Sequence, residues 1–228
     1  MLTVKQDLEV VESELFGGQL ACPKCAGGLR PWGWARFRKI RHGTGAGQDL
    51  VGYHPRRARC AGCAATHVLL AVSLAARRAD GAEVIASAIE AKTAKGQGHR
   101  VIAAWLDRPA STVRDWLRDF SRCAPKITGM FTALVLRDAP DAAGVWPRPA
   151  AGDAGRALSA LLAYAGVLGG RFGALVTVAW VQAGIAACNG WLFCRPWWEK
   201  RPNTNPPLCP EEPARHAVGN TCPDPGQV

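Results

Sequence analysis

Acidic residues are scarce in much of this 228-residue chain. Between Leu20 and Asp80 they number two, Asp49 and Asp80, against eleven lysines and arginines. The few carboxylates after residue 125 are scattered, so none of them forms the pair that a two-metal active site needs. The sequence also lacks a nucleophile beside a base and a glycine loop suited to phosphate. We therefore expect no enzymatic activity.

The start of the chain lacks the basic stretch and apolar core of a secretion signal. This favours a cytoplasmic location, in which the nine cysteines stay reduced. Under reducing conditions, closely paired cysteines bind metal more often than they form disulfides.

Four cysteines form two C-x2-C pairs, Cys22 with Cys25 and Cys60 with Cys63. Two such turns can complete a tetrahedral zinc site, and four thiolates leave no position open for catalysis. Residues 32–41 and 51–59 are typical of two strands joined by the glycine-rich loop 43–47. The sequence therefore predicts a zinc ribbon over residues 20–76 with one structural zinc ion. A redox dithiol or an iron–sulfur cluster would leave the basic hairpin unexplained, and a contribution from His67 to the metal site stays open.

Residues 77–125 have the pattern of a trihelical domain, with helices expected at 81–94, 99–106 and 111–122. Apolar residues recur at helical spacing in the last two, and Pro109 separates them. The pattern predicts a helix-turn-helix whose second helix enters a DNA major groove, although similar helix pairs occur in domains that bind nothing. The residues expected to read bases are Ser111, Thr112, Arg114, Asp115 and Arg118.

The formal net charge of +10 is concentrated between residues 20 and 80, as expected of a nucleic-acid-binding surface. A basic surface facing only solvent is the alternative. Aromatic residues alternate with the basic ones and are expected to pack, or less often to stack on bases. The candidates for contacts to the DNA backbone are Arg36, Arg38, Lys39, Arg41, Arg56, Arg57, Arg59, His99 and Arg100.

The remaining segments predict an α+β protein with less informative ends. Residues 1–19 form an N-terminal extension, 126–156 a linker, 157–194 an apolar helical region, and 195–228 a Pro-rich tail that we expect to be disordered. Residues 172–194 are uncharged and long enough to span a membrane. Because Gln182 and Asn189 lie inside this stretch, we favour helices that pack on each other or on a second copy of the chain.

Three stretches carry a resemblance to a known family: CPKCAGGLRPWGWARFRKIR, RRARCAGCAATHVLL and GQGHRVIAAWLDRPASTVRDWLRDF. They resemble an uncharacterised actinobacterial family of zinc-ribbon and helix-turn-helix proteins that is associated with transposases and other mobile elements. The same order of parts is similar to the N-termini of insertion-sequence transposases. The resemblance covers roughly residues 20 to 125 and implies DNA binding. It matches Cys22, Cys25, Cys60 and Cys63 to the metal ligands and residues 111–118 to the recognition helix.

The leading hypothesis is a non-enzymatic, nucleoid-associated protein that binds double-stranded DNA as an accessory part of a mobile element. A transposase or integrase, or a second copy of the chain, would then be its protein partner. The first alternative is a transcriptional regulator with the same DNA contacts. The second is a membrane-tethered or structural interaction protein that acts through residues 172–194.

Overall fold

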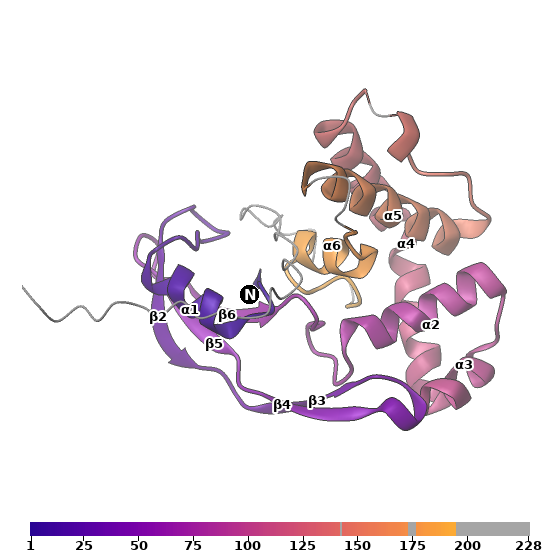
Figure 1. Cartoon of the computed structure of the whole chain (residues 1–228), viewed down its shortest axis with the longest axis horizontal. Coiled ribbons are helices and arrows are strands. Elements are labelled where there is room, and N and C mark those ends of the chain that lie inside the picture. The colour runs from indigo at the N-terminus through magenta and orange to yellow at the C-terminus, as the bar shows by residue number, and fades with distance from the viewer. Residues whose placement is uncertain (142, 173–176, 195–228) are drawn as a thin grey trace, which may run out of the picture.

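A computed structural model of the chain describes residues 1–141, 143–172 and 177–194 and shows an α+β protein. The strands are β1 (Leu2–Val4), β2 (Leu29–Trp34), β3 (Arg38–His42), β4 (Asp49–Tyr53), β5 (Arg56–Cys60) and β6 (Thr66–Ala71). The helices are α1 (Leu8–Phe16), α2 (Ala82–Lys95), α3 (His99–Leu106), α4 (Ala110–Asp138), α5 (Gly152–Phe172) and α6 (Trp180–Ala187). We refer to α1 with the strands as the sheet part and to α2–α6 as the helical part (Figure 1).

The sheet part is built on a four-stranded sheet in the order β1-β6-β5-β2. β1 runs parallel to β6, whereas β6, β5 and β2 pair antiparallel. Val11 and Leu15 of α1 are buried in one cluster with Leu2, Leu29 and Ala58 of the strands. The expected N-terminal extension, residues 1–19, therefore contributes a strand and a covering helix to this core.

A long, bent hairpin joins the two cysteine pairs, where the sequence predicts two uninterrupted strands. β2 pairs with β5 close to the cysteines, and β3 pairs with β4 farther out. At the bend, Ala35 N–H donates to Pro55 O at 2.8 Å. The tip of the hairpin contains the short 3-10 turn Gly45–Gly47 and lies beside α3 (Figure 1). The hairpin thus reaches from the cysteines to the helical part.

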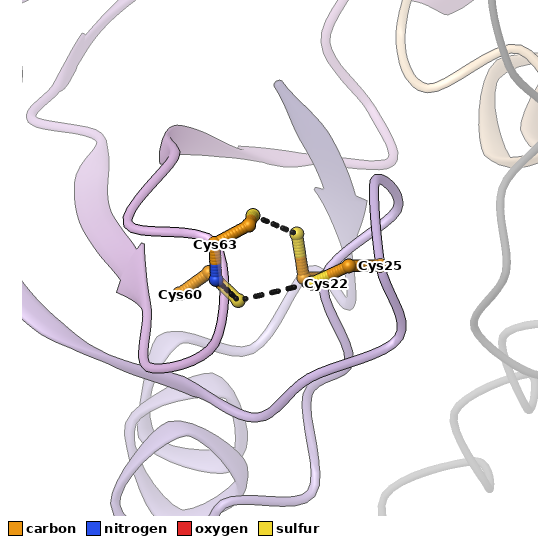
Figure 2. Close-up of side chains that lie close together, drawn as sticks. All are labelled: Cys22, Cys25, Cys60 and Cys63. Atoms are coloured by element: carbon orange, nitrogen blue, oxygen red, sulfur yellow. Dashed lines mark hydrogen bonds between the residues drawn. The ribbon is translucent and has the colours of Figure 1, made fainter.

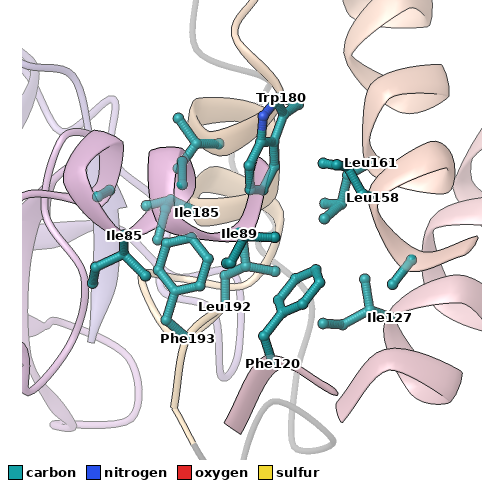
Figure 3. Packing of buried hydrophobic residues seen from close by; sticks show 14 of the residues in the cluster. Ile85, Ile89, Phe120, Ile127, Leu158, Leu161, Trp180, Ile185, Leu192 and Phe193 are labelled. Carbon is teal, nitrogen blue, oxygen red and sulfur yellow. The ribbon is translucent and has the colours of Figure 1, made fainter. Parts of the chain in front are cut away.

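The helical part has one hydrophobic core to which each of its five helices contributes. Ile89 of α2, Phe120 of α4 and Leu161 of α5 are fully or almost fully buried there, together with Trp180 and Ile185 of α6 (Figure 3). The trihelical unit expected at residues 77–125 therefore shares its core with the apolar region expected at 157–194.

Helix α4 is much longer than the sequence predicts, because it continues from Ala110 through Pro125 to Asp138. An interior proline costs a helix about 3 kcal/mol. Beyond the proline, Ile127, Phe131 and Val135 are at most 1 % exposed. The ring centroid of Phe131 lies 5.6 Å from that of Tyr164 in α5. Burying each such side chain stabilises the fold by about 1.5–3 kcal/mol, which outweighs the proline. The expected linker 126–156 is therefore helical up to Asp138 and again from Gly152.

The described part of residues 172–194 packs inside the protein. Thr3 N–H donates to Asn189 Oδ1 at 3.3 Å, and Thr3 Oγ1 donates to Ile185 O at 3.2 Å. These bonds connect the end of α6 to β1. Among the helices that the structure describes, none combines the length and the apolar character that a membrane crossing requires. The Pro-rich tail, 195–228, lies outside the described residues.

Candidate metal centre and nucleic-acid surface

Both C-x2-C pairs fold into the same kind of turn. Ala26 N–H donates to Cys22 O at 2.8 Å, and Ala64 N–H donates to Cys60 O at 3.1 Å. Ala26 and Ala64 both have left-handed backbone conformations, with φ of 59° and 57°. This conformation costs a residue other than glycine about 1 kcal/mol. The two segments thus share a strained turn that directs each pair of thiols toward one point.

The four thiols form a compact group, as Figure 2 shows. Cys22 Sγ lies 3.7 Å from Cys63 Sγ, and Cys25 Sγ lies 3.5 Å from Cys60 Sγ. All four sulfur atoms lie within 4.8 Å of one another. Zinc–sulfur bonds of about 2.3 Å in a tetrahedron separate the sulfurs by about 3.8 Å, whereas a disulfide bond is about 2.05 Å. The four free cysteines are therefore placed to hold a metal ion.

The thiols differ in how readily they ionise. The N–H of Cys63 donates to Cys60 Sγ at 3.5 Å. This hydrogen bond is the largest of the causes that lower the pKa of Cys60 to about 6. At Cys25, a bond from Gly27 N–H favours the thiolate, but the surrounding thiols outweigh it and raise the pKa of Cys25 to about 11. Adjacent thiolates repel each other, which opposes ionisation of all four cysteines. A bound cation would offset this repulsion and favour the thiolate form of each.

His67 lies beside the thiols without joining them. Its Nε2 is 3.4 Å from Cys22 Sγ, and the residue is 8 % exposed. Burial lowers the pKa of His67, which favours the neutral ring. Of the residues described, the four cysteines alone form the close group of ligand atoms. His67 is thus placed to hydrogen-bond a ligand and hold it in position.

The predicted base-reading residues lie at the start of α4. Helix α3 ends at Leu106, Asp107 adopts a left-handed conformation with φ of 54°, and α4 begins after Pro109. On one side of α4, Val113 and Trp116 are buried in the helical core. The predicted residues face the other way, with Thr112 half-buried and the others exposed: Ser111, Arg114, Asp115 and Arg118.

A buried ionic cluster attaches the hairpin tip to the turn between α3 and α4. Arg108 Nε lies 2.6 Å from Asp80 Oδ1, and Arg41 of β3 lies 3.0 Å from Asp80 Oδ2. The Arg108 guanidinium also donates to Gln48 Oε1 and, at 3.4 Å, to Gly43 O near the tip. The side chains of Arg108 and Asp80 are 0 % and 3 % exposed. The hairpin and the helix pair are therefore linked through a charge network whose central pair, Arg108 and Asp80, is shielded from water.

Sequence reasoning missed the role of Arg108 and Asp80. Asp80 lies directly before Gly81, the N-cap residue of α2. The available signal was that Asp80 is one of two acids in a strongly basic segment. A lone acid among many arginines is expected to pair with one of them in the interior. The choice of Arg108 depends on the tertiary structure.

The predicted contacts to the DNA backbone differ in their exposure and in their partners. Arg36, Lys39, Arg59 and Arg100 are exposed. Others are engaged within the fold: Arg38 donates to Ala75 O at 3.3 Å, Arg41 pairs with Asp80, and Arg56 pairs with Glu12 at 2.8 Å. Arg57 and His99 are half-buried. The exposed group is the one accessible to phosphates.

Comparisons of the chain with models of protein families, with curated proteins and with solved structures give no match. The resemblance to a transposase-associated family therefore stays a prediction from the motifs.

Proposed function

We propose that this protein binds double-stranded DNA and reads its sequence with the first turns of α4. The observation that supports the proposal is that one face of this segment is buried and the opposite face is exposed. Trp116 is held in the core while Arg114 and Arg118 point to solvent, as a recognition helix requires. Arginine can bind guanine through two hydrogen bonds, and aspartate can accept one from cytosine.

The four cysteines hold a structural zinc ion in this proposal. Four thiolates at tetrahedral spacing suit zinc and leave no open position for water. The ion joins the two turns at the base of the hairpin, and the ionic cluster around Arg108 fixes the tip to the helix pair. Exposed Arg36 and Lys39 then contact phosphates from a scaffold of fixed orientation.

The biological setting follows the resemblance. We propose an accessory DNA-binding part of a mobile element, with no chemical step of its own. A transcriptional regulator would use the same surface on a promoter, so the identity of the target separates the two roles. Against the third hypothesis, α6 uses Trp180 and Ile185 in the protein's own core.

The first test is selection of bound sequences from a random duplex library, with full-length zinc-loaded protein at near-physiological salt. We expect a defined motif to be enriched, and a palindromic motif would indicate a dimer. Salt-sensitive binding without a motif would contradict base reading by α4.

Two variants then assign the roles of the surface. Arg114→Ala should relax base preference at one position of the motif and weaken its binding by about 1–3 kcal/mol. Lys39→Ala should weaken binding to all duplexes and reduce the salt slope by about one. Arg156→Ala on α5, whose side chain is 54 % exposed, is the matched control and should change neither property. The same uniform loss for Arg114→Ala and Lys39→Ala would refute the division of roles.

A further inference from the structure

Three aromatic rings gather on the surface where the hairpin bends. Trp34 and His54 lie 5.1 Å apart between ring centroids with planes tilted by 32°, and Phe37 meets His54 edge-on at 6.3 Å. Trp34 is 50 % and Phe37 52 % exposed, and His54 is exposed as well. We call Trp34, Phe37 and His54 the aromatic elbow. Within the described chain the guanidinium of Arg56 lies over the ring of Trp34, yet about half of Trp34 and of Phe37 remains exposed, although burial of such rings normally stabilises a fold.

The inner side of the hairpin holds the elbow in place. Tyr53 OH accepts from Ala71 N–H at 3.1 Å, Arg38 donates to Ala75 O, and Ile40 is 1 % exposed. The strand register pairs Arg38 with Tyr53, so these side chains share the inner face. The rings therefore stand on a backbone that is already anchored to β6, and binding to them requires little further ordering.

A glycine makes room for one of the rings. A Cβ atom at Gly52 would lie 2.8 Å from Phe37 Cζ, closer than carbon atoms normally approach. Phe37 thus lies directly over the backbone of β4. Any side chain at residue 52 would displace the ring, which offers a way to disturb the elbow without removing an aromatic group.

The charge around the elbow is positive. Arg36 and Lys39 are exposed next to it, and the guanidinium of Arg56 lies 4.6 Å from the centroid of the Trp34 ring. Glu12 pairs with Arg56, and Asp49 stands at the far end of β4. Exposed rings interleaved with cations match the bases and the phosphates of an unpaired nucleic-acid strand.

We propose that the aromatic elbow binds single-stranded nucleic acid, with unpaired bases stacking on Trp34 and Phe37 while Arg36 and Lys39 contact the phosphates. A duplex hides the faces of its bases, so this surface selects a different substrate from the α4 surface. The proposal goes beyond the proposed function, because its aromatic rings lie outside the helix-turn-helix. It shares Arg36 and Lys39 with the duplex surface, so Trp34 and Phe37 are the residues that distinguish the two proposals.

Trp32 provides a matched control on the same strand. It is also 50 % exposed and carries a stacked arginine, Arg59, at 4.6 Å. The β2–β5 register pairs Pro31 with Ala58 and Trp34 with Arg56, so β2 holds one extra residue there. This bulge leaves Trp32 on the face of Arg59 and Trp34 on the face of Arg56, away from each other.

The test measures binding of labelled oligothymidine and oligouridine, each about ten nucleotides long, and of a random duplex to full-length zinc-loaded protein. Trp34→Ala and Phe37→Ala should each weaken binding of single strands about tenfold. Trp34→Phe should retain most of the affinity, and Gly52→Ala should lose part of it with both rings present. Trp32→Ala should change it less than about twofold. Comparison of the two strand types shows whether the elbow prefers a DNA or an RNA strand, and binding of either supports the proposal.

Several outcomes would overturn the proposal. These are undetectable binding of both single strands, equal affinity of Trp34→Ala and wild type, or an equal loss in Trp32→Ala. A change from dimer to monomer in Trp34→Ala, measured by sedimentation, would show that the elbow joins two copies of the chain. Bound zinc verifies that each variant is folded. Arg114→Ala should leave single-strand binding unchanged, so failure of the duplex proposal and failure of this one are distinguishable.

Discussion

In the helical part, Phe120 and Phe131 are almost completely buried, whereas in the sheet part Trp32, Trp34 and Phe37 remain about half exposed. The helical part gains its stability from a continuous apolar core. The sheet part has a small core around α1 and places its largest apolar side chains on the surface. A metal ion joining the two cysteine turns would compensate for this small core, because metal binding contributes directly to folding. The comparison indicates that the large side chains of the sheet part, which do not enter its hydrophobic core, are available for binding.

Metal removal should separate the two parts most clearly. In Cys60→Ser, we expect the metal to be lost and the amides of β5 and β6 to exchange rapidly with solvent, because structural zinc sites contribute about 10 kcal/mol or more. The amides of α2, α4 and α5 should keep their protection. Hydrogen exchange with mass spectrometry and metal analysis provide the measurement. Cys123→Ser, at a buried cysteine of the helical core, is the control and should retain the metal. Equal loss of protection in both parts would show that they fold as one unit.

The converse change targets the helical core. Phe131→Ala should lower the free energy of unfolding by about 4 kcal/mol, because it leaves a cavity between α4 and α5. Denaturant titration followed by circular dichroism measures this, and the metal content should stay at the wild-type value. Leu162→Ala on α5, where leucine is 52 % exposed, should cost less than about 1 kcal/mol. A similar cost at both positions would contradict the packing described for α4 and α5.

The next largest loss of stability is expected from disrupting the ionic cluster between the two parts. Asp80→Asn leaves Arg108 buried without its carboxylate and should lower the free energy of unfolding by about 3 kcal/mol. Arg41→Ala should cost less, because the Arg41 side chain is 34 % exposed. Hydrogen exchange at the hairpin tip should rise in Asp80→Asn. Unchanged exchange there would mean that the tip is held by other contacts.

The effect that is smallest near neutral pH concerns a thiol of the helical part. Burial raises the pKa of Cys188 from 9.0 to about 12. The unfolded chain therefore loses this proton first, and stability falls by about 1.4 kcal/mol per pH unit from about pH 9 toward pH 12. Below pH 9 this contribution is fully present. Unfolding curves of Cys188→Ala and wild type should thus converge as the pH rises above 9. A difference that is independent of pH would contradict the burial of this thiol.

Local patterns predicted much of the secondary structure and the cysteine group. The helices expected at 81–94 and 99–106 correspond to α2 (Ala82–Lys95) and α3 (His99–Leu106). Glycines mark their limits, and apolar spacing marks their buried faces. The C-x2-C pairs predicted a common site because each pair closes a local turn. The DNA contacts of α4 stay a prediction.

Other features depended on residues far apart in the chain. The extension of α4 past Pro125 rests on burial of Phe131 against Tyr164, which no local rule anticipates. The position of Arg41 likewise depends on Asp80, so a basic residue that the sequence predicts as a DNA contact also supports the fold.

The sequence by itself determined the cysteine turns, the basic hairpin and the amphipathic helices, because each is encoded by spacing within a short segment. Only the tertiary structure decided which arginines remain exposed, because burial of Arg108 requires an acid that the chain supplies 28 residues away. It also decided that Trp34, Phe37 and His54 meet, since a β-bulge and a bend bring rings from both arms of the hairpin onto one surface.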